Sequence, residues 1–121
     1  PGPGQHRRQE AFSGRYAIVY LTPEMLPSCL EDIAVLHRLG CGGGDGGVGL
    51  LAVDEAHCIS QWGQDFREAF LSLDCFRKHT VLADIPLMAL TATAVPRVQT
   101  DIKRALHLTP DCLESVTSVD R

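Results

Sequence analysis

The sequence predicts an α/β fold in which a parallel β-sheet is covered by helices on both faces. Three short, almost continuous apolar runs occur at residues 16–21, 50–53 and 86–91. Each run is followed by a segment whose apolar residues recur at helical spacing. Strands that are apolar along their whole length and alternate with helices are typical of parallel sheets buried on both faces. The chain of 121 residues is long enough for one domain of this kind.

The first forty residues are expected to form a lead-in, a strand and a helix. Residues 1–13 begin with two Pro-Gly pairs and are predicted to be flexible or to hold a short helix at residues 6–12. The apolar run at residues 16–21 is short, which favours a buried strand over a helix. A helix should follow, with Pro27 in its first turn and Gly40 at its end. The apolar side chains at helical spacing in it are Leu26, Leu30, Ile33 and Leu36.

After a glycine-rich segment, the rest of the chain again alternates between predicted strands and helices. Residues 40–49 contain seven glycines and are predicted to be a flexible loop or an insertion. Buried strands are predicted at residues 50–53 and 86–91, with one helix between them and a second helix after the later strand. A last strand is expected at residues 113–116. The apolar faces of the two helices comprise Phe66, Phe70, Leu73 and Phe76, and Val98, Ile102 and Leu106.

Polar residues gather where the predicted strands end. In parallel sheets, functional residues collect in the loops at the carboxyl ends of the strands. Three clusters occupy such positions here, and we expect them to form one site. The clusters are Thr22, Pro23 and Glu24; Asp54, Glu55, Ala56 and His57; and Thr91, Ala92 and Thr93.

The Asp54-Glu55 pair suits the hydrolysis of a nucleotide. Carboxylates at the end of a buried strand are costly unless something uses them. Magnesium is bound through one or two carboxylates and keeps several waters, which fits Asp54. Glu55 could then orient or deprotonate the attacking water, and His57 could link neighbouring loops through its two ring nitrogens. The alternative is that the carboxylates, like Thr91 and Thr93, only cap the starts of helices.

The segment between these clusters has features of a nucleic-acid contact. Trp62, the only tryptophan, lies in a polar loop beside a glycine. An aromatic face in such a loop can stack on exposed bases, at about 1–3 kcal/mol per base. Arg67 could contact a phosphate. Alternatively, Trp62 and Phe66 fill the core, and for Phe66, which is in register with the following helix, this is the better interpretation.

A phosphate-binding P-loop is missing from the sequence. Such a loop needs the pattern G-x-x-x-x-G-K-[ST] between a strand and a helix. Residues 40–49 contain no Lys, Ser or Thr and precede a strand, and no other segment matches. An ATPase without this element lacks the main cradle for nucleotide phosphates, so we expect the chain to be a fragment.

The charge, hydropathy and cysteine spacing of the chain limit the classes of protein to which it can belong. The net charge of −4 predicts that any contact with nucleic acid is made by local loops, since the chain as a whole is not basic. No membrane span or signal peptide is visible. The cysteines are spread singly without a CxxC pair, so we expect reduced thiols in an intracellular protein and no zinc site. They are Cys29, Cys41, Cys58, Cys75 and Cys112.

Four segments together resemble one known family. LLAVDEAHCISQWGQDFREAF at residues 50–70 and PLMALTATAVPRVQTDIKRALHL at residues 86–108 closely resemble the RecQ group of superfamily 2 DNA helicases, including its Werner-like members. YAIVYLTPEML at residues 16–26 resembles the segment that this group carries just upstream, and SVDR at residues 118–121 resembles the passage from the first motor lobe to the second. The similarity covers residues 14–121.

The resemblance implies an activity for the intact protein. Residues 14–121 would be the C-terminal part of the ATP-binding RecA-like lobe 1, incomplete in this chain. The intact protein would be an ATP-dependent helicase that moves 3′ to 5′ on DNA in recombination and repair. Its cofactors would be ATP and Mg²⁺, and its partners single-stranded or 3′-tailed DNA and the second motor lobe. We expect no membrane partner, a nuclear location in a eukaryote, and no activity from these residues alone.

The resemblance also implies roles for single residues. Asp54 would associate with magnesium through water, Glu55 would be the catalytic base, and His57 would take part in coupling. The loop at residues 60–67 would sense single-stranded DNA. Gln64 departs from the group, which usually has His there; Gln keeps a donor and an acceptor but cannot carry charge. The residues implied in DNA binding or coupling are Thr22, Pro23, Glu24, Ser60, Trp62, Gln64, Phe66, Arg67, Thr91 and Thr93.

Two other functions stay open from the sequence. One is a truncated module that binds DNA or a protein without hydrolysing ATP. The other is an RNA-directed DEAH-box helicase. DNA is favoured over RNA because the related RNA helicases do not continue with a CISQWG-type loop after the DEAH residues.

Overall fold

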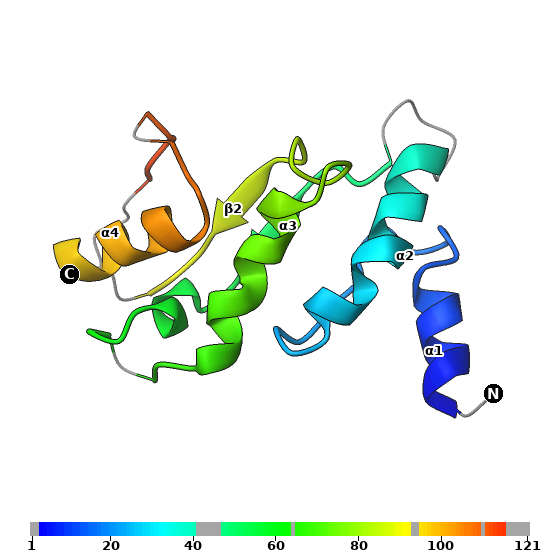
Figure 1. Ribbon diagram of the computed structural model, residues 1–121, viewed down its shortest axis with the longest axis horizontal. Coiled ribbons are helices and arrows are strands. Elements are labelled where there is room, and N and C mark those ends of the chain that lie inside the picture. Colours follow the sequence, from blue (N-terminus) through cyan, green and yellow to red (C-terminus); the bar gives the residue numbers. More distant parts are fainter. Residues whose placement is uncertain (1–2, 41–46, 64, 93–94, 110, 116–121) are drawn as a thin grey trace, which may run out of the picture.

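The computed structural model confirms the α/β fold class. Strand β1 (Leu51–Val53) pairs in parallel with β2 (Leu87–Ala89), with Leu51 opposite Leu87 and Val53 opposite Ala89. In Figure 1 β2 runs between α3 and α4. The described residues are 3–40, 47–63, 65–92, 95–109 and 111–115.

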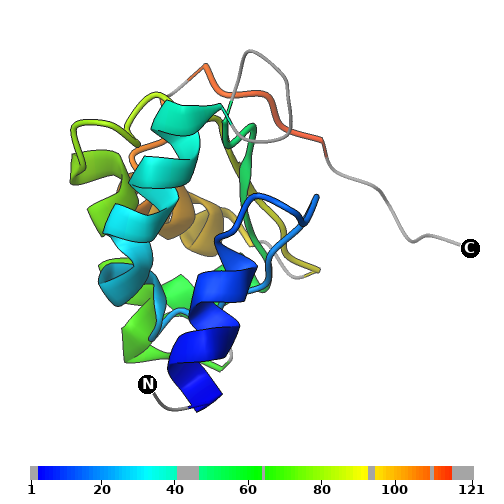
Figure 2. The same ribbon diagram turned by 90° about the vertical axis from the view of Figure 1, so that its right-hand side faces the viewer.

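The helical elements are short. Figure 1 shows α1 and α2 side by side at one end of the molecule and α4 at the other, and Figure 2, viewed from the α1–α2 end, shows these two helices in front. Within the described part of the chain, no helix is long and apolar enough to cross a membrane. The elements are α1 (Pro3–Ala11), α2 (Leu26–Leu39), the 3₁₀ helices η1 (Ala56–Ile59) and η2 (Glu68–Asp74), α3 (Cys75–Lys78) and α4 (Pro96–Ala105).

Helix α2 begins and ends where the sequence predicts. Pro27 lies in its first turn, and Gly40 ends it in the left-handed region at φ 59°, a conformation that costs glycine little. The helix buries Leu26, Cys29, Ile33 and Ala34. Leu30 and Leu36 of the predicted apolar set are only half-buried.

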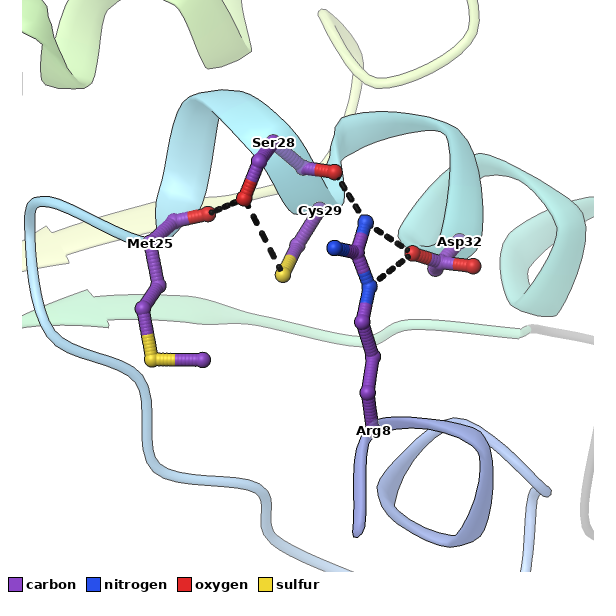
Figure 3. A network of polar contacts seen from close by, with 5 residues as sticks. All are labelled: Arg8, Met25, Ser28, Cys29 and Asp32. Carbon is purple, nitrogen blue, oxygen red and sulfur yellow. Dashed lines mark hydrogen bonds and ion pairs between the residues drawn. The ribbon is translucent and has the colours of Figure 1, made fainter. Parts of the chain in front are cut away.

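A polar contact joins α1 to α2 (Figure 3). The Arg8 guanidinium donates to Oδ2 of Asp32 from Nε at 2.9 Å and from Nη2 at 2.6 Å, and also contacts the carbonyl of Ser28. Both side chains of this ion pair are 39% exposed, so water weakens the attraction between them. The pair therefore fixes where α1 lies more than it stabilises the fold.

The core lies between α2, η2, α3 and α4. Phe76 and Leu82 are completely buried, and Ile85 and Leu106 are almost so. The predicted apolar face of α4 is confirmed, because Val98 and Ile102 are buried beside them. This packing fixes α4 against η1 and η2, which places the start of α4 beside the segment that follows β1.

The prediction of a strand at residues 16–21 is wrong. The segment is irregular, and its alternate residues point outward: Ile18 is 70% exposed and Tyr20 is 90% exposed. A strand exists only when a neighbouring strand satisfies its backbone N–H and C=O groups. Among the described residues the sheet contains β1 and β2 alone, so the apolar run has no ladder to join.

Two further predictions need correction. The strand expected at residues 113–116 is absent from residues 113–115, and residue 116 lies outside the described part of the chain. The helix expected from Phe66 starts instead at Glu68, as a 3₁₀ helix that becomes α-helical only at Cys75. The Ser72 hydroxyl donates to the carbonyl of Ala69, three residues earlier, at 2.8 Å. Such local side-chain bonds compete with regular α-helical pairing.

Candidate functional site

The carboxyl ends of β1 and β2 bring two of the predicted clusters together. The N–H of Leu90 donates to the carbonyl of Val53 at 2.8 Å, and the N–H of Ala56 donates to the carbonyl of Leu90 at 2.9 Å. These bonds continue the parallel ladder past the strands themselves. The Asp54–His57 turn and Thr91 are consequently neighbours, as expected for a parallel sheet.

Asp54 and Glu55 form an exposed turn with a strained backbone. Oδ1 of Asp54 accepts the N–H of Glu55 at 2.9 Å. Glu55 has φ 53° and ψ 41°, the left-handed region that a side chain such as glutamate rarely adopts. This conformation costs a non-glycine residue about 1–2 kcal/mol. The Glu55 side chain is 61% exposed, so the turn presents its carboxylate to solvent.

His57 lies beneath this turn and joins it to the next loop. Its side chain is 9% exposed; Nδ1 lies 2.8 Å from Oγ1 of Thr91, and Nε2 lies 3.5 Å from Oε2 of Glu55. In the neutral tautomer with a proton on Nε2, Nδ1 accepts from the Thr91 hydroxyl and Nε2–H faces the Glu55 carboxylate. One ring therefore contacts both loops. Thr93 lies outside the described residues.

The donor set at this turn fits magnesium held mainly by water and phosphate. Among the described residues, no three His, Cys, Asp or Glu side chains come together as a metal site. Magnesium does not need such a cage, because it keeps several waters and is commonly held by one or two carboxylates together with substrate phosphates. The exposed carboxylate of Asp54 can meet that requirement.

The aromatic loop is attached to α4. The Ser60 hydroxyl, in a residue that is 1% exposed, donates to Oδ2 of Asp101 at 2.6 Å and accepts the N–H of Trp62 at 3.1 Å. The Trp62 side chain is 66% exposed and therefore does not fill the core. The guanidinium of Arg97 lies 4.2 Å from the centre of its ring, a cation–π contact. Gln64 lies outside the described residues.

Arg67 connects the aromatic loop to the Thr22–Glu24 cluster. Its guanidinium forms an ion pair with the Glu24 carboxylate and lies 5.6 Å from the ring centre of Phe70. A backbone hydrogen bond to the Glu24 carboxylate and the nearby Arg67 lower the pKa of Glu24, although partial desolvation opposes them. Phe66 is half-buried, Thr22 is exposed and Pro23 half-buried. In this structure the Arg67 charge is therefore already paired.

The sequence reasoning missed three contributors to this region. Arg97 and Asp101 are one turn apart on α4, a spacing that puts them on the same face of the helix, but only the packed loop shows what they contact. Gly63 is the third. A Cβ there would lie 3.2 Å from the carbonyl oxygen of His57, a tight contact, and 3.4 Å from Cγ2 of Val98, so a side chain at this position would press on the backbone of His57.

Four cysteines lie in the described part of the chain, and none is in a disulfide. Cys29 and Cys58 are buried, whereas Cys75 and Cys112 are half-buried. Burial raises the pKa of the Cys58 thiol, which adjoins His57, and that of Cys75. The thiols of Cys58 and Cys75 therefore stay protonated near neutral pH.

Comparison with known proteins shows the family to which the chain is related. The sequence matches the DEAD/DEAH box helicase family over residues 2–102. It is 36% identical over 120 residues to the ATP-dependent DNA helicase Q-like SIM of Arabidopsis thaliana, covering 93% of this chain and 13% of that protein. It is 45% identical over 96 residues to the ATP-dependent DNA helicase RecQ of Bacillus subtilis, covering 78% of this chain and 15% of that protein. Over 99 residues it is 45% identical to the ATP-dependent DNA helicase Q5 of Mus musculus, covering 78% of this chain and 9% of that protein.

The chain therefore belongs to the DEAD/DEAH box helicase family. Within that family, its similarity to plant, bacterial and mammalian relatives of the RecQ type confirms the resemblance to the RecQ group. The chain spans less than a sixth of the length of the relatives just named.

Proposed function

We propose that this chain supplies the water-activating turn and the DNA-sensing loop of an ATP-dependent DNA helicase. The intact enzyme would move 3′ to 5′ on single-stranded or 3′-tailed DNA, in recombination and repair. The single observation that carries the proposal is the position of His57, which contacts both Glu55 and Thr91. The names of the relatives support ATP and DNA as the ligands, since they are ATP-dependent DNA helicases.

In this proposal the two acidic residues divide the work of hydrolysis. Asp54 would hold a magnesium ion through water, and a bound ion would neutralise charge on the nucleotide phosphates. Glu55 accepts a hydrogen bond from the attacking water and takes its proton. Its strained backbone supports this role, since residues kept in rare conformations cluster at functional sites.

The aromatic loop would report bound DNA to the hydrolytic turn. Trp62 exposes a ring on which a base can stack, and Arg67, five residues later in the sequence, carries a charge that suits a phosphate. Because Arg67 is paired with Glu24, a phosphate has to replace that carboxylate. His57 and Thr91 would transmit the change between the loops. Thr93 and Gln64 are proposed members of the same system.

A first experiment tests whether these residues act alone. The sequence has no P-loop, so we expect no DNA-stimulated phosphate release from the 121-residue chain above that of a Glu55→Gln control. Oligo(dT) should nevertheless bind and quench the fluorescence of Trp62. Substantial turnover that Glu55→Gln removes would show that the chain is a complete ATPase and refute the proposed division of the site.

A second experiment distinguishes the motor from a binding module. Residues 14–121 would replace the matching stretch of the Bacillus subtilis relative, which would supply the rest of the motor. We expect this chimera to hydrolyse ATP in the presence of DNA, and Glu55→Gln to abolish hydrolysis while oligo(dT) still binds. A folded chimera that binds DNA without hydrolysis would favour the module. Stronger stimulation by poly(U) than by oligo(dT) would favour an RNA-directed helicase.

The proposal includes a location for the intact protein. As a DNA helicase it would act inside the cell, and in the nucleus of a eukaryote. A fluorescent fusion of the full-length protein tests this directly, because exclusion from the DNA-containing compartment would contradict it.

A further inference from the structure

Helix α4 contacts the aromatic loop at two points that are one helical turn apart. Asp101 accepts the hydroxyl hydrogen of Ser60 at 2.6 Å, and Ser60 in turn accepts the N–H of Trp62 at 3.1 Å. Four residues earlier, Arg97 lies over the indole ring of Trp62 at 4.2 Å. One contact fixes the backbone of Trp62 and the other its side chain.

We propose that Asp101 and Arg97 are positioning residues. They hold the indole of Trp62, on which a base would stack, against helix α4, which follows Thr91 in the sequence. The orientation of Trp62 would then follow α4 and would not depend on the loop alone. The inference about DNA rests on the function proposed above, but the positioning of the indole does not.

The contact through Asp101 carries the backbone part of this proposal. Ser60 is 1% exposed, so water cannot readily replace a lost partner of its hydroxyl. The same hydroxyl accepts from Trp62 and donates to Asp101, and chained hydrogen bonds of this kind strengthen one another. Removing the Asp101 carboxylate should therefore loosen Trp62 even though the two residues do not touch.

The contact through Arg97 carries the side-chain part. Arg97 is itself exposed, and a guanidinium stacked on indole is a favourable cation–π pair. With Arg97 in place, Trp62 is still 66% exposed, which leaves room for a base on the ring. The guanidinium also brings a positive charge beside the ring, and arginine charges pair with the phosphates of nucleic acid. Arg97 would thus orient the ring and favour the ligand.

The first test uses the indole of Trp62, the only tryptophan, without DNA. The ¹⁵N heteronuclear NOE of its Nε1–H reports motion of the ring on the picosecond to nanosecond scale. We expect a clear fall in this NOE for Asp101→Ala and for Arg97→Gln. Asp101→Asn should restore the value, because its amide oxygen can still accept from Ser60.

The matched controls are Asp84→Ala and Arg104→Gln, which change the same charges at exposed positions. They should leave the NOE unchanged, and circular dichroism should show the same helix content in every variant. Arg97 is on the surface, so Arg97→Gln keeps the test valid if Asp101→Ala does not fold. An indole NOE that stays at the wild-type value in the folded variants would overturn the proposal.

The second test adds oligo(dT) and follows Trp62 fluorescence. Since one stacked base contributes about a tenfold change in affinity, Asp101→Ala and Arg97→Gln should weaken binding by about fivefold or more. Asp101→Asn should stay within about twofold of wild type, because it keeps the acceptor. Failure of the wild-type chain to bind oligo(dT) would refute the proposed function, whereas the indole NOE would still decide the positioning.

Discussion

Because the backbone of Glu55 is strained, we predict that glycine at this position gives a more stable protein than alanine, the reverse of their usual order. Glu55→Ala keeps a Cβ in the left-handed region, which costs about 1–2 kcal/mol. Glu55→Gly removes this strain. Because glycine is more flexible in the unfolded chain, it loses more conformational entropy on folding, which costs about 0.5–1 kcal/mol relative to alanine. Both variants lose the same exposed side chain and its contact with His57, so those losses cancel. At the midpoints of these two ranges, the glycine variant should therefore be more stable than the alanine variant by about 0.75 kcal/mol.

Urea unfolding of the 121-residue chain measures this difference directly. The matched pair is Thr100→Gly and Thr100→Ala, at an exposed position inside α4, where alanine should be the more stable by about 1 kcal/mol. The order of the two residues should thus reverse between the two sites. If Glu55→Ala proved as stable as Glu55→Gly while the Thr100 pair behaved as expected, the strain assigned to Glu55 would be wrong.

Three further predictions concern the contacts around the site and the core. Thr91→Val leaves the buried Nδ1 of His57 without its hydroxyl partner, so urea unfolding should show a loss of about 1–3 kcal/mol, and Thr91→Ser should restore most of it. Phe76→Ala empties a fully buried position and should cost about 3–5 kcal/mol; a loss below 1 kcal/mol in the same assay would contradict the assigned core. The pKa of Glu24 is lower in the folded protein than in the unfolded chain, so its contribution to stability is complete above the unfolded pKa and is lost as the pH falls through the folded pKa. Urea unfolding between pH 7 and pH 3 should show a smaller loss for Arg67→Gln, which removes one cause of the lowered pKa, and equal losses would show that the ion pair does not contribute.

The elements predicted correctly from the sequence are those that local pattern determines. Helix α2 has proline in its first turn and glycine at its end, and α4 carries its apolar residues on one face. The strand predicted at residues 16–21 failed for a different reason. Its apolar composition is that of a strand, but pairing depends on a neighbouring backbone, and the composition of a segment does not report its neighbour.

The same distinction applies to the candidate site. The sequence predicts that Asp54 and Thr91 lie close together, because the carboxyl ends of parallel strands meet at one edge. The left-handed backbone of Glu55 was not predictable, since glutamate gives no sign of positive φ. Asp101 and Arg97 were not predictable either, because their partners are 41 and 35 residues away and meet them only through the packing of η1 on α4.

The contacts of His57 and Ser60 suggest why hydrolysis and DNA binding would respond to one another. Both residues lie within a few positions of Glu55, on the short buried helix η1 and at its end. His57 joins this helix to Thr91, and Ser60 joins it to Asp101 of α4. Because Thr91 lies shortly before α4 in the sequence, a displacement of Thr91 and α4 together would act on η1 through both contacts. A well-packed buried helix shifts as a unit more readily than it deforms. The carboxylate of Glu55 and the ring of Trp62 should therefore move together, whichever of the two ligands binds first.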